Sequence, residues 1–155
     1  MKGRTAAFAV AAGLLAASPA LADQGCAGTR TSTSSKLTVH VTGVRRATGE
    51  VAITVYPDDR RRFLAKGGKL ARQRVRAAAT VRACFWAPEG SYAVAVYHDS
   101  DGDRDFDRTL VGLPAEGFGF SNDPDTKTGL PSLSAVRFRL GPGERVVPIQ
   151  MKYLR

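Results

Sequence analysis

Five aspartates at alternate positions are the side chains of this sequence best suited to binding a cation. They are Asp99, Asp101, Asp103, Asp105 and Asp107. They follow residues 92–97, an apolar run that predicts a buried strand. Oxygens at positions one, three, five, seven and nine of a tight loop can converge on Ca2+, which binds about six to eight oxygen ligands. We predict that the carboxylates of Asp99, Asp101, Asp103 and Asp107, with the carbonyl of Asp105, bind Ca2+.

The negative charge of this loop requires a positive counterpart. Residues 99–125 hold eight of the fourteen acids of the chain and only two bases, Arg104 and Arg108. Carboxylates a few ångströms apart repel by roughly a kcal/mol in water, and by more where solvent is excluded. The alternative to a bound ion is a metal-free turn whose aspartates cap backbone N–H groups and pair with arginines. The loop is not an EF-hand, because Gly102 stands at position four and Leu110 replaces the glutamate at position twelve.

Two cysteines, Cys26 and Cys84, predict one disulfide in an oxidising compartment, because two cysteines allow a single intramolecular pairing. If Val81, Ala83 and Phe85 face the core, Cys84 points outward, where a tail carrying Cys26 can be pinned across the sheet. The alternative is a pair of unpaired thiols.

The segment 116–122 holds candidates for contact with a ligand. Phe118 and Phe120 lie between glycines and could stack on a sugar or another ring, and Glu116 and Asn122 flank them. The alternative is that both phenylalanines cap the open end of a hydrophobic core.

No catalytic residues are predicted. The chain has two histidines, His40 and His98, and no nucleophile-elbow motif. A small hydrolase that uses His98 and acids near Glu116 is the alternative to a non-enzymatic protein.

Residues 1–22 have the organisation of a secretory signal peptide. Lys2 and Arg4 precede a small and apolar run that ends in the sequence ALA, an A-x-A cleavage site. We therefore expect an exported protein, periplasmic or extracellular, without a transmembrane anchor after cleavage. The mature chain should begin with a flexible Ser/Thr-rich tail at 23–35 and continue as one domain at 36–155.

The formal net charge of +9 indicates attraction to anions. An exported protein meets lipid head groups and acidic polysaccharides, so an anionic envelope component is the expected partner class, and nucleic acid is not expected. Arg72, Arg74 and Arg76 alternate along one predicted strand, where they form either a solvated face or an anion-binding face.

Period-two alternation of apolar residues predicts about seven short strands and no helices after the signal peptide. Residues 37–42 and 51–55 both alternate around a turn, which predicts a hairpin between them. Pro148 lacks an N–H group and places the last strand at an edge or a bulge. The pattern as a whole predicts an all-β fold, a single antiparallel two-sheet sandwich.

Residues 88–153 resemble a bacterial family known as domain of unknown function 2141. The resemblance rests on PEGSYAVAVYHD, DSDGDRDFD, GLPAEGFGFSN and VPIQMKY. It implies an exported transthyretin-like, or prealbumin-like, sandwich without an assigned role. The family loop more often carries asparagines and a second glycine where this chain has Asp101, Asp103 and Arg104, and loss of that glycine hinders a left-handed turn. We predict a non-enzymatic binding or structural module of the cell envelope.

Overall fold

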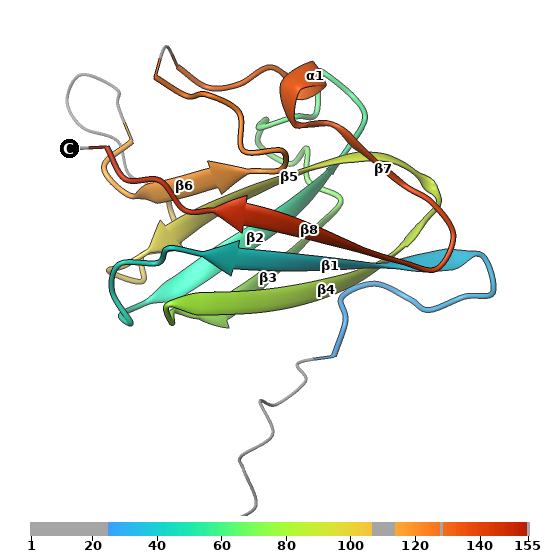
Figure 1. Ribbon diagram of the computed structural model, residues 1–155, viewed down its shortest axis with the longest axis horizontal. Helices are drawn as coiled ribbons and strands as arrows, with labels where there is room; N and C mark the ends of the chain where they lie inside the picture. Colours follow the sequence, from blue (N-terminus) through green and yellow to red (C-terminus); the bar gives the residue numbers. More distant parts are fainter. Residues whose placement is uncertain (1–24, 107–113, 128, 155) are drawn as a thin grey trace, which may run out of the picture.

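Eight strands form two β-sheets that pack face to face (Figure 1). The computed structural model describes residues 25–106, 114–127 and 129–154, so the predicted signal peptide lies outside the described residues. The elements are β1 (Ser34–Thr42), β2 (Glu50–Pro57), β3 (Ala71–Arg76), β4 (Thr80–Pro88), β5 (Gly90–Asp99), β6 (Gly117–Phe120), α1 (Leu133–Val136), β7 (Phe138–Leu140) and β8 (Glu144–Gln150). The all-β sandwich expected from the sequence is confirmed.

One sheet has three strands in the order β4-β1-β8, and the other has five, ordered β3-β2-β5-β6 with β7 also paired to β5. β6 pairs with the end of β5 and β7 with its beginning. Pro148 therefore lies on an edge strand, as its missing N–H group predicted.

Four details differ from the sequence expectations. The prediction of a hairpin between residues 37–42 and 51–55 is wrong, because β1 pairs with β4 and β8 whereas β2 lies in the other sheet. The sandwich is not wholly antiparallel, since β1 and β8 run parallel. One short helix, α1, follows β6, and β1 begins at Ser34, two residues before the expected domain start. Alternation identifies the buried face of a strand but not its neighbours.

The main core fills the space between the two sheets. β1 contributes Leu37, Val39 and Val41, which are fully buried, while the residues between them remain partly exposed. Val94 and Val96 of β5 face them from the other sheet. Complete burial of each such side chain contributes about 1.5 to 3 kcal/mol, so this layer is the principal stabilising feature of the sandwich.

A second apolar cluster lies on the opposite, outer face of the five-stranded sheet. Tyr56 of β2 and Phe118 and Phe120 of β6 are buried there, together with Leu133 and Val136 of α1. Outward-facing positions of these strands are therefore not simply solvated. This outer cluster is the setting of the candidate site.

β6 has the sequence GFGF because its two faces meet very different neighbours. A Cβ on Gly117 would lie 2.4 Å from the Tyr153 ring, and a Cβ on Gly119 would lie 2.7 Å from Ile149 Cγ2. Glycine is thus required on the inner face, where the end of the three-stranded sheet presses against the strand. The alternating phenylalanines point to the outer face by the strand periodicity.

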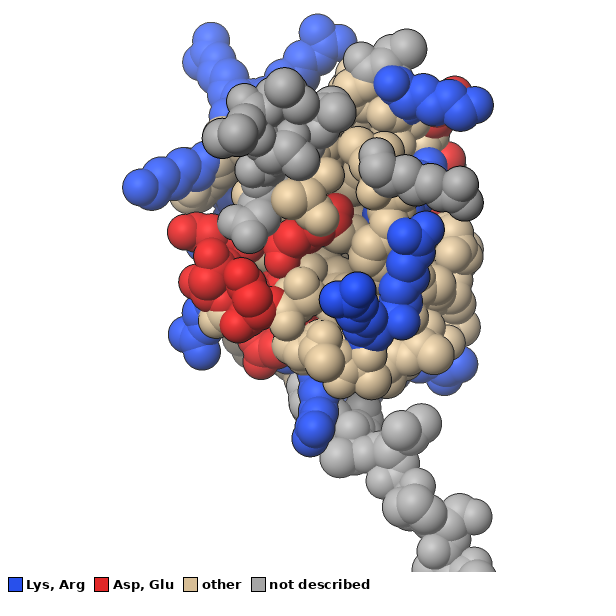
Figure 2. Space-filling view, turned by 90° about the vertical axis from the view of Figure 1, so that its left-hand side faces the viewer, with Lys and Arg blue, Asp and Glu red and all other residues tan. Residues whose placement is uncertain are grey.

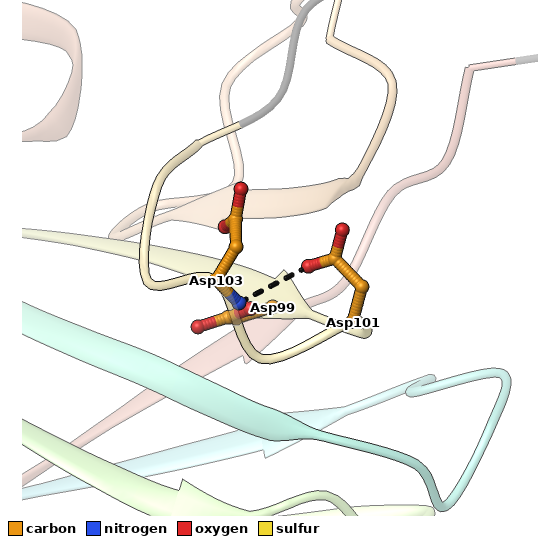
Figure 3. A group of neighbouring side chains, drawn as sticks. All are labelled: Asp99, Asp101 and Asp103. Atoms are coloured by element: carbon orange, nitrogen blue, oxygen red, sulfur yellow. Dashed lines mark hydrogen bonds between the residues drawn. The ribbon is translucent and has the colours of Figure 1, made fainter.

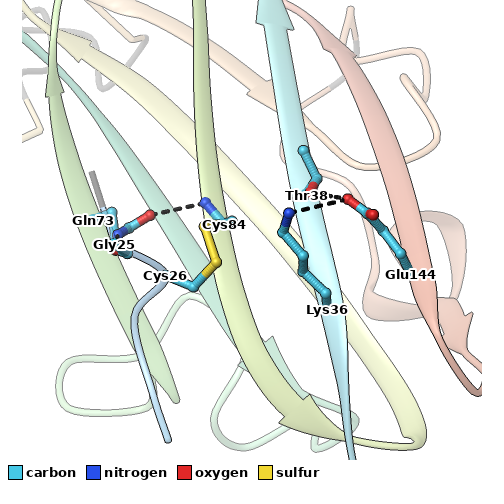
Figure 4. Close-up of a disulfide and its surroundings, with 7 residues drawn as sticks. All are labelled: Gly25, Cys26, Lys36, Thr38, Gln73, Cys84 and Glu144. Carbon is cyan, nitrogen blue, oxygen red and sulfur yellow. Dashed lines mark hydrogen bonds and ion pairs between the residues drawn. A yellow bond between two sulfur atoms is a disulfide. The ribbon is translucent and has the colours of Figure 1, made fainter. Parts of the chain in front are cut away.

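The disulfide predicted between Cys26 and Cys84 is present (Figure 4). It fastens the segment before β1 along the free edge of β4, where the Ala27 N–H donates to the Cys84 carbonyl at 2.9 Å. Gln73 of the other sheet receives the Cys84 N–H at its Oε1 and donates from Nε2 to the Gly25 carbonyl. The disulfide and Gln73 together join the β3 and β4 edges of the sandwich.

Candidate functional site

The acidic loop begins at Asp99, the last residue of β5, whose side chain is completely buried. Its Oδ1 accepts the Gly102 N–H at 2.9 Å, and its Oδ2 accepts the Arg104 N–H at 3.1 Å. Arg74 Nη1 donates to the same Oδ2 at 2.7 Å. A buried carboxylate requires such partners, because an unpaired charge is strongly disfavoured away from water.

Arg74 joins the loop to the outer face of the five-stranded sheet. Its Nη2 donates to the Tyr97 hydroxyl at 2.7 Å and to the Arg104 carbonyl at 3.1 Å. Burial opposes the charged guanidinium, but the hydrogen bonds to Tyr97 and Asp99 hold the pKa of Arg74 above its usual value. The arginine-paired turn considered as the alternative to a metal is therefore formed around Asp99.

The next aspartates cap their own turn. Asp101 Oδ1 accepts the Asp103 N–H at 3.3 Å, and Asp103 Oδ1 accepts the Asp105 N–H at 2.8 Å. Figure 3 shows the Asp101 carboxylate turned toward the Asp103 backbone. Carboxylate oxygens of Asp99, Asp101 and Asp103 lie within 4.8 Å of one another. The fifth predicted ligand, Asp107, lies outside the described residues.

Acidic side chains gather at one end of the sandwich, surrounded by Lys and Arg (Figure 2). Asp101, Asp103 and Asp105 are exposed. Within the described part of the chain, the ion pairs of residues 99–105 are confined to Arg74 with Asp99. Arginine compensation thus reaches the buried carboxylate, and the exposed ones face solvent.

Arg104 takes the left-handed backbone conformation, with φ of 70°. The resemblance to the family placed a glycine at this point of the loop, where left-handed geometry costs nothing. The loop therefore keeps the turn although the side chain disfavours it. Hydrogen bonds of the Arg104 N–H to Asp99 and of its carbonyl with Arg74 and Tyr97 hold the residue in place.

Beside this loop, the outer face of the five-stranded sheet contains a cavity of about 440 Å³. Its floor is made by Thr54 of β2 and Ala95 of β5, which are direct partners in the antiparallel register. Both side chains are small, so they project only a short way from the sheet at this point. Larger neighbours on the same face leave a hollow above them.

Aromatic side chains form the walls of the cavity. They are Tyr56, Tyr97, Phe106, Phe118 and Phe120. The rings contact one another edge to face, with centroids 5.5 Å apart for Tyr97 and Phe106 and 6.0 Å apart for Phe118 and Phe120. Such contacts fix the orientation of each ring and give a preformed apolar surface.

Positive side chains complete the lining on the β3 side. Arg72 of β3 donates from Nε to Thr54 Oγ1 at 2.7 Å, and Lys66 and Lys69 come from the connection between β2 and β3. Arg62 holds that connection by donating to the Gly68 carbonyl at 3.1 Å and the Lys69 carbonyl at 3.3 Å. Arg62 therefore helps to hold the backbone at Lys69.

Tyr56 provides a hydroxyl group close to Arg72. Burial raises the pKa of Tyr56 above its usual value, although the positive charge of Arg72 and a hydrogen bond to it act in the opposite direction. The hydroxyl therefore stays protonated and can donate or accept a hydrogen bond.

The four ligand-contact candidates of segment 116–122 lie in three different places. Phe118 and Phe120 line the cavity. Glu116 is buried near the acidic loop and accepts the Ser100 N–H at 3.2 Å. Asn122 donates from Nδ2 to the carbonyls of Ala135 and Arg137, so its amide anchors the chain around α1.

His98, the candidate base of the hydrolase alternative, faces the interior at 2 % exposure. Its Nε2 lies 2.8 Å from the Thr48 carbonyl, which can only accept, so Nε2 carries a proton. Its Nδ1 lies 2.9 Å from the Tyr153 hydroxyl, which in turn accepts the Arg45 N–H. Both ring nitrogens are engaged, so the geometry gives His98 a structural role at the end of β5.

A family model described as "Uncharacterized protein conserved in bacteria (DUF2141)" matches residues 39–148. The chain belongs to this family. The match contains the acidic loop and all described residues around the cavity, and it confirms the resemblance found in the sequence. Neither the curated proteins nor the solved structures include a match to this DUF2141 chain, so its transthyretin-like character stays a prediction.

Most of the cavity of this DUF2141 protein was missed by sequence reasoning. Thr54 and Ala95 are small residues in ordinary strands, and their significance comes from being paired across β2 and β5. Tyr56 and Tyr97 also appear as ordinary strand residues. A signal was present in Arg72, since the alternate spacing of Arg72, Arg74 and Arg76 places all three on one face of the strand.

In the ranges that the structure describes, no helix has the length and apolar character needed to cross a bilayer.

Proposed function

We propose that this DUF2141 protein is an exported, non-enzymatic binding module whose ligand occupies the cavity over Thr54 and Ala95. The observation that carries the proposal is a preformed hollow of about 440 Å³ with aromatic walls and a cationic side. Its volume falls within the range of small-molecule sites, about 300 to 1,000 Å³. Export is supported by the signal-peptide pattern and by the disulfide, which persists in oxidising compartments.

The proposal is tested by filling the cavity floor. Ala95 is partly exposed between buried neighbours, so Ala95→Leu extends a side chain into the hollow. Fluorescence titration of the mature protein with 8-anilino-1-naphthalenesulfonate and with uncharged N-phenyl-1-naphthylamine should give saturable binding of at least one probe. Ala95→Leu should weaken that binding at least tenfold without loss of the cooperative thermal transition. If neither probe shows saturable binding, the proposal is contradicted.

We also propose that the acidic loop binds Ca2+ weakly. Support comes from the three carboxylates that lie within 4.8 Å of one another and from the exposure of Asp101 and Asp103. Arg74 competes for the third, Asp99, because it already neutralises that carboxylate. An affinity in the range of extracellular calcium modules, about 0.1 to 1 mM, is consistent with such competition.

A further inference from the structure

We propose that the ligand of the cavity is a small organic acid, with an apolar ring held at the β6 end and its anionic group held at the β3 end. This inference rests on the proposed function and specifies the chemistry of the same site.

The register of the sheet gives the cavity two chemically different ends. Arg72 is paired with Thr54, Thr54 with Ala95, and Ala95 with Phe120. These four residues form one row across β3, β2, β5 and β6, with a cation at one end, a ring at the other and two small side chains between. Three strand spacings of about 4.8 Å make the row roughly 14 Å long. A molecule lying along it meets opposite chemistry at its two ends.

The described lining of the cavity carries positive charge. Arg72, Lys66 and Lys69 border the cavity, and its described lining contains no carboxylate. Among the described residues, none of the three forms an ion pair with an acid. Arg72 is half-buried, whereas Lys66 and Lys69 are exposed at the rim. Cations that border an apolar hollow without a counter-ion among the described residues favour an anionic ligand through charge complementarity.

Arg72 differs from its neighbour Arg74 in its hydrogen-bond partners. Arg74 is committed to the Asp99 carboxylate, the Tyr97 hydroxyl and the Arg104 carbonyl. Arg72 instead donates from Nε to the neutral Thr54 hydroxyl, and its guanidinium lies 5.7 Å from the Tyr97 ring centroid. Arg72 is thus held in position with its charge uncompensated by a described carboxylate, whereas Arg74 is a structural residue.

The test compares two probes that share their rings and differ in charge. The anionic 8-anilino-1-naphthalenesulfonate should bind at least tenfold more tightly than uncharged N-phenyl-1-naphthylamine. Arg72→Gln should remove this preference by weakening the anionic probe and leaving the uncharged one within twofold. Arg82→Gln is the matched control, since Arg82 is exposed on β4 in the other sheet and should change neither affinity. The double change Lys66→Gln and Lys69→Gln provides a second test if Arg72→Gln unfolds the protein.

Displacement experiments test the acid group directly. 2-Naphthoate should displace the anionic probe, and 2-naphthalenemethanol, which has the same rings and no charge, should not do so at equal concentration. Equal affinity for charged and uncharged probes would overturn this inference while leaving the cavity as a binding site. Failure of both probes to bind would overturn the proposed function itself. Loss of anionic binding in Arg82→Gln as well as Arg72→Gln would indicate attraction to the whole basic surface and would also overturn the inference.

Discussion

Arg74 and Asp99 meet across β2, with Nη1 of the arginine 2.7 Å from Oδ2 of the aspartate. The carboxylate is fully buried, and the arginine side chain is 17 % exposed. Because β2 lies between their two strands, this pair fixes the start of the acidic loop to the far edge of the sheet. The ion pair thus ties the loop to β3, the strand that also carries Arg72 of the cavity lining.

Removal of the Asp99 charge should destabilise the protein substantially. Asp99→Asn removes the short, buried ion pair of Arg74 and leaves only its longer pair with the more exposed Glu50, at 3.8 Å, so we expect the free energy of unfolding to fall by about 3 kcal/mol. Urea denaturation checks this value. The matched control is Asp58→Asn, which breaks a more exposed pair with Arg137 and should cost about 1 kcal/mol or less. Equal effects of the two changes would contradict a special role for Asp99.

Arg104 should be replaceable by glycine with a gain in stability. Its φ of 70° lies in the region that glycine adopts without steric cost, so Arg104→Gly should raise the free energy of unfolding by about 1 kcal/mol. Thermal melting under identical conditions measures the change. Arg82→Gly, within the regular strand β4, should instead destabilise by a similar amount. A lower melting temperature for Arg104→Gly would show that the arginine side chain itself supports the loop.

Calcium should raise the melting temperature of the mature protein. We expect a rise at millimolar Ca2+, because an ion bound only to the folded state stabilises it by mass action. Asp103→Ala should abolish the rise, whereas Asp125→Ala, which removes an exposed acid outside the loop, should preserve it. An unchanged melting curve of the unmodified protein at millimolar Ca2+ would reject the metal proposal.

The disulfide should contribute strongly to stability. Cys26 and Cys84 are 58 residues apart, and closing a loop of that length restricts the unfolded chain by about 4 kcal/mol in the chain-entropy model. The double change Cys26→Ala and Cys84→Ala should lower the free energy of unfolding by about 2 to 4 kcal/mol. Gln73→Ala, which keeps the disulfide and removes two hydrogen bonds beside it, should cost about 1 to 2 kcal/mol. A larger loss of stability in Gln73→Ala than in the double cysteine variant would show that the disulfide is not the stronger of the two links.

Tyr56 should make the protein sensitive to alkaline pH. Burial favours the neutral phenol and raises its pKa in the folded state, so this contribution to stability is complete below pH 10. It is lost as pH rises through the folded-state pKa, because the unfolded chain releases the proton earlier. Absorbance titration near 295 nm should detect a late-titrating tyrosine that is missing in Tyr56→Phe. Tyr92, whose pKa burial also raises, should continue to titrate late in that variant.

The two-sheet fold and the inward faces of its strands could be predicted because alternation depends on neighbours within one strand. Leu37, Val39 and Val41 are buried as that alternation requires. Alternation could not predict which strands pair with one another. β1 and β2 are consecutive and well patterned, yet they belong to different sheets. Only part of the candidate site could be predicted, because the rest also depends on how the strands pair. Phe118 and Phe120 stand out by type and spacing, but the hollow above Thr54 and Ala95 depends on long-range register that the sequence does not display.

The residues after β8 hold β6 in place, and β6 carries Phe118 and Phe120 of the cavity wall. Lys152 both donates to and accepts from the backbone of Phe118, so β6 is bonded to β5 on one side and to the last residues of the chain on the other. Truncation after Gln150 would remove both of these hydrogen bonds and leave that edge of β6 without them. Recombinant protein intended for ligand screening should therefore include residues 151–154.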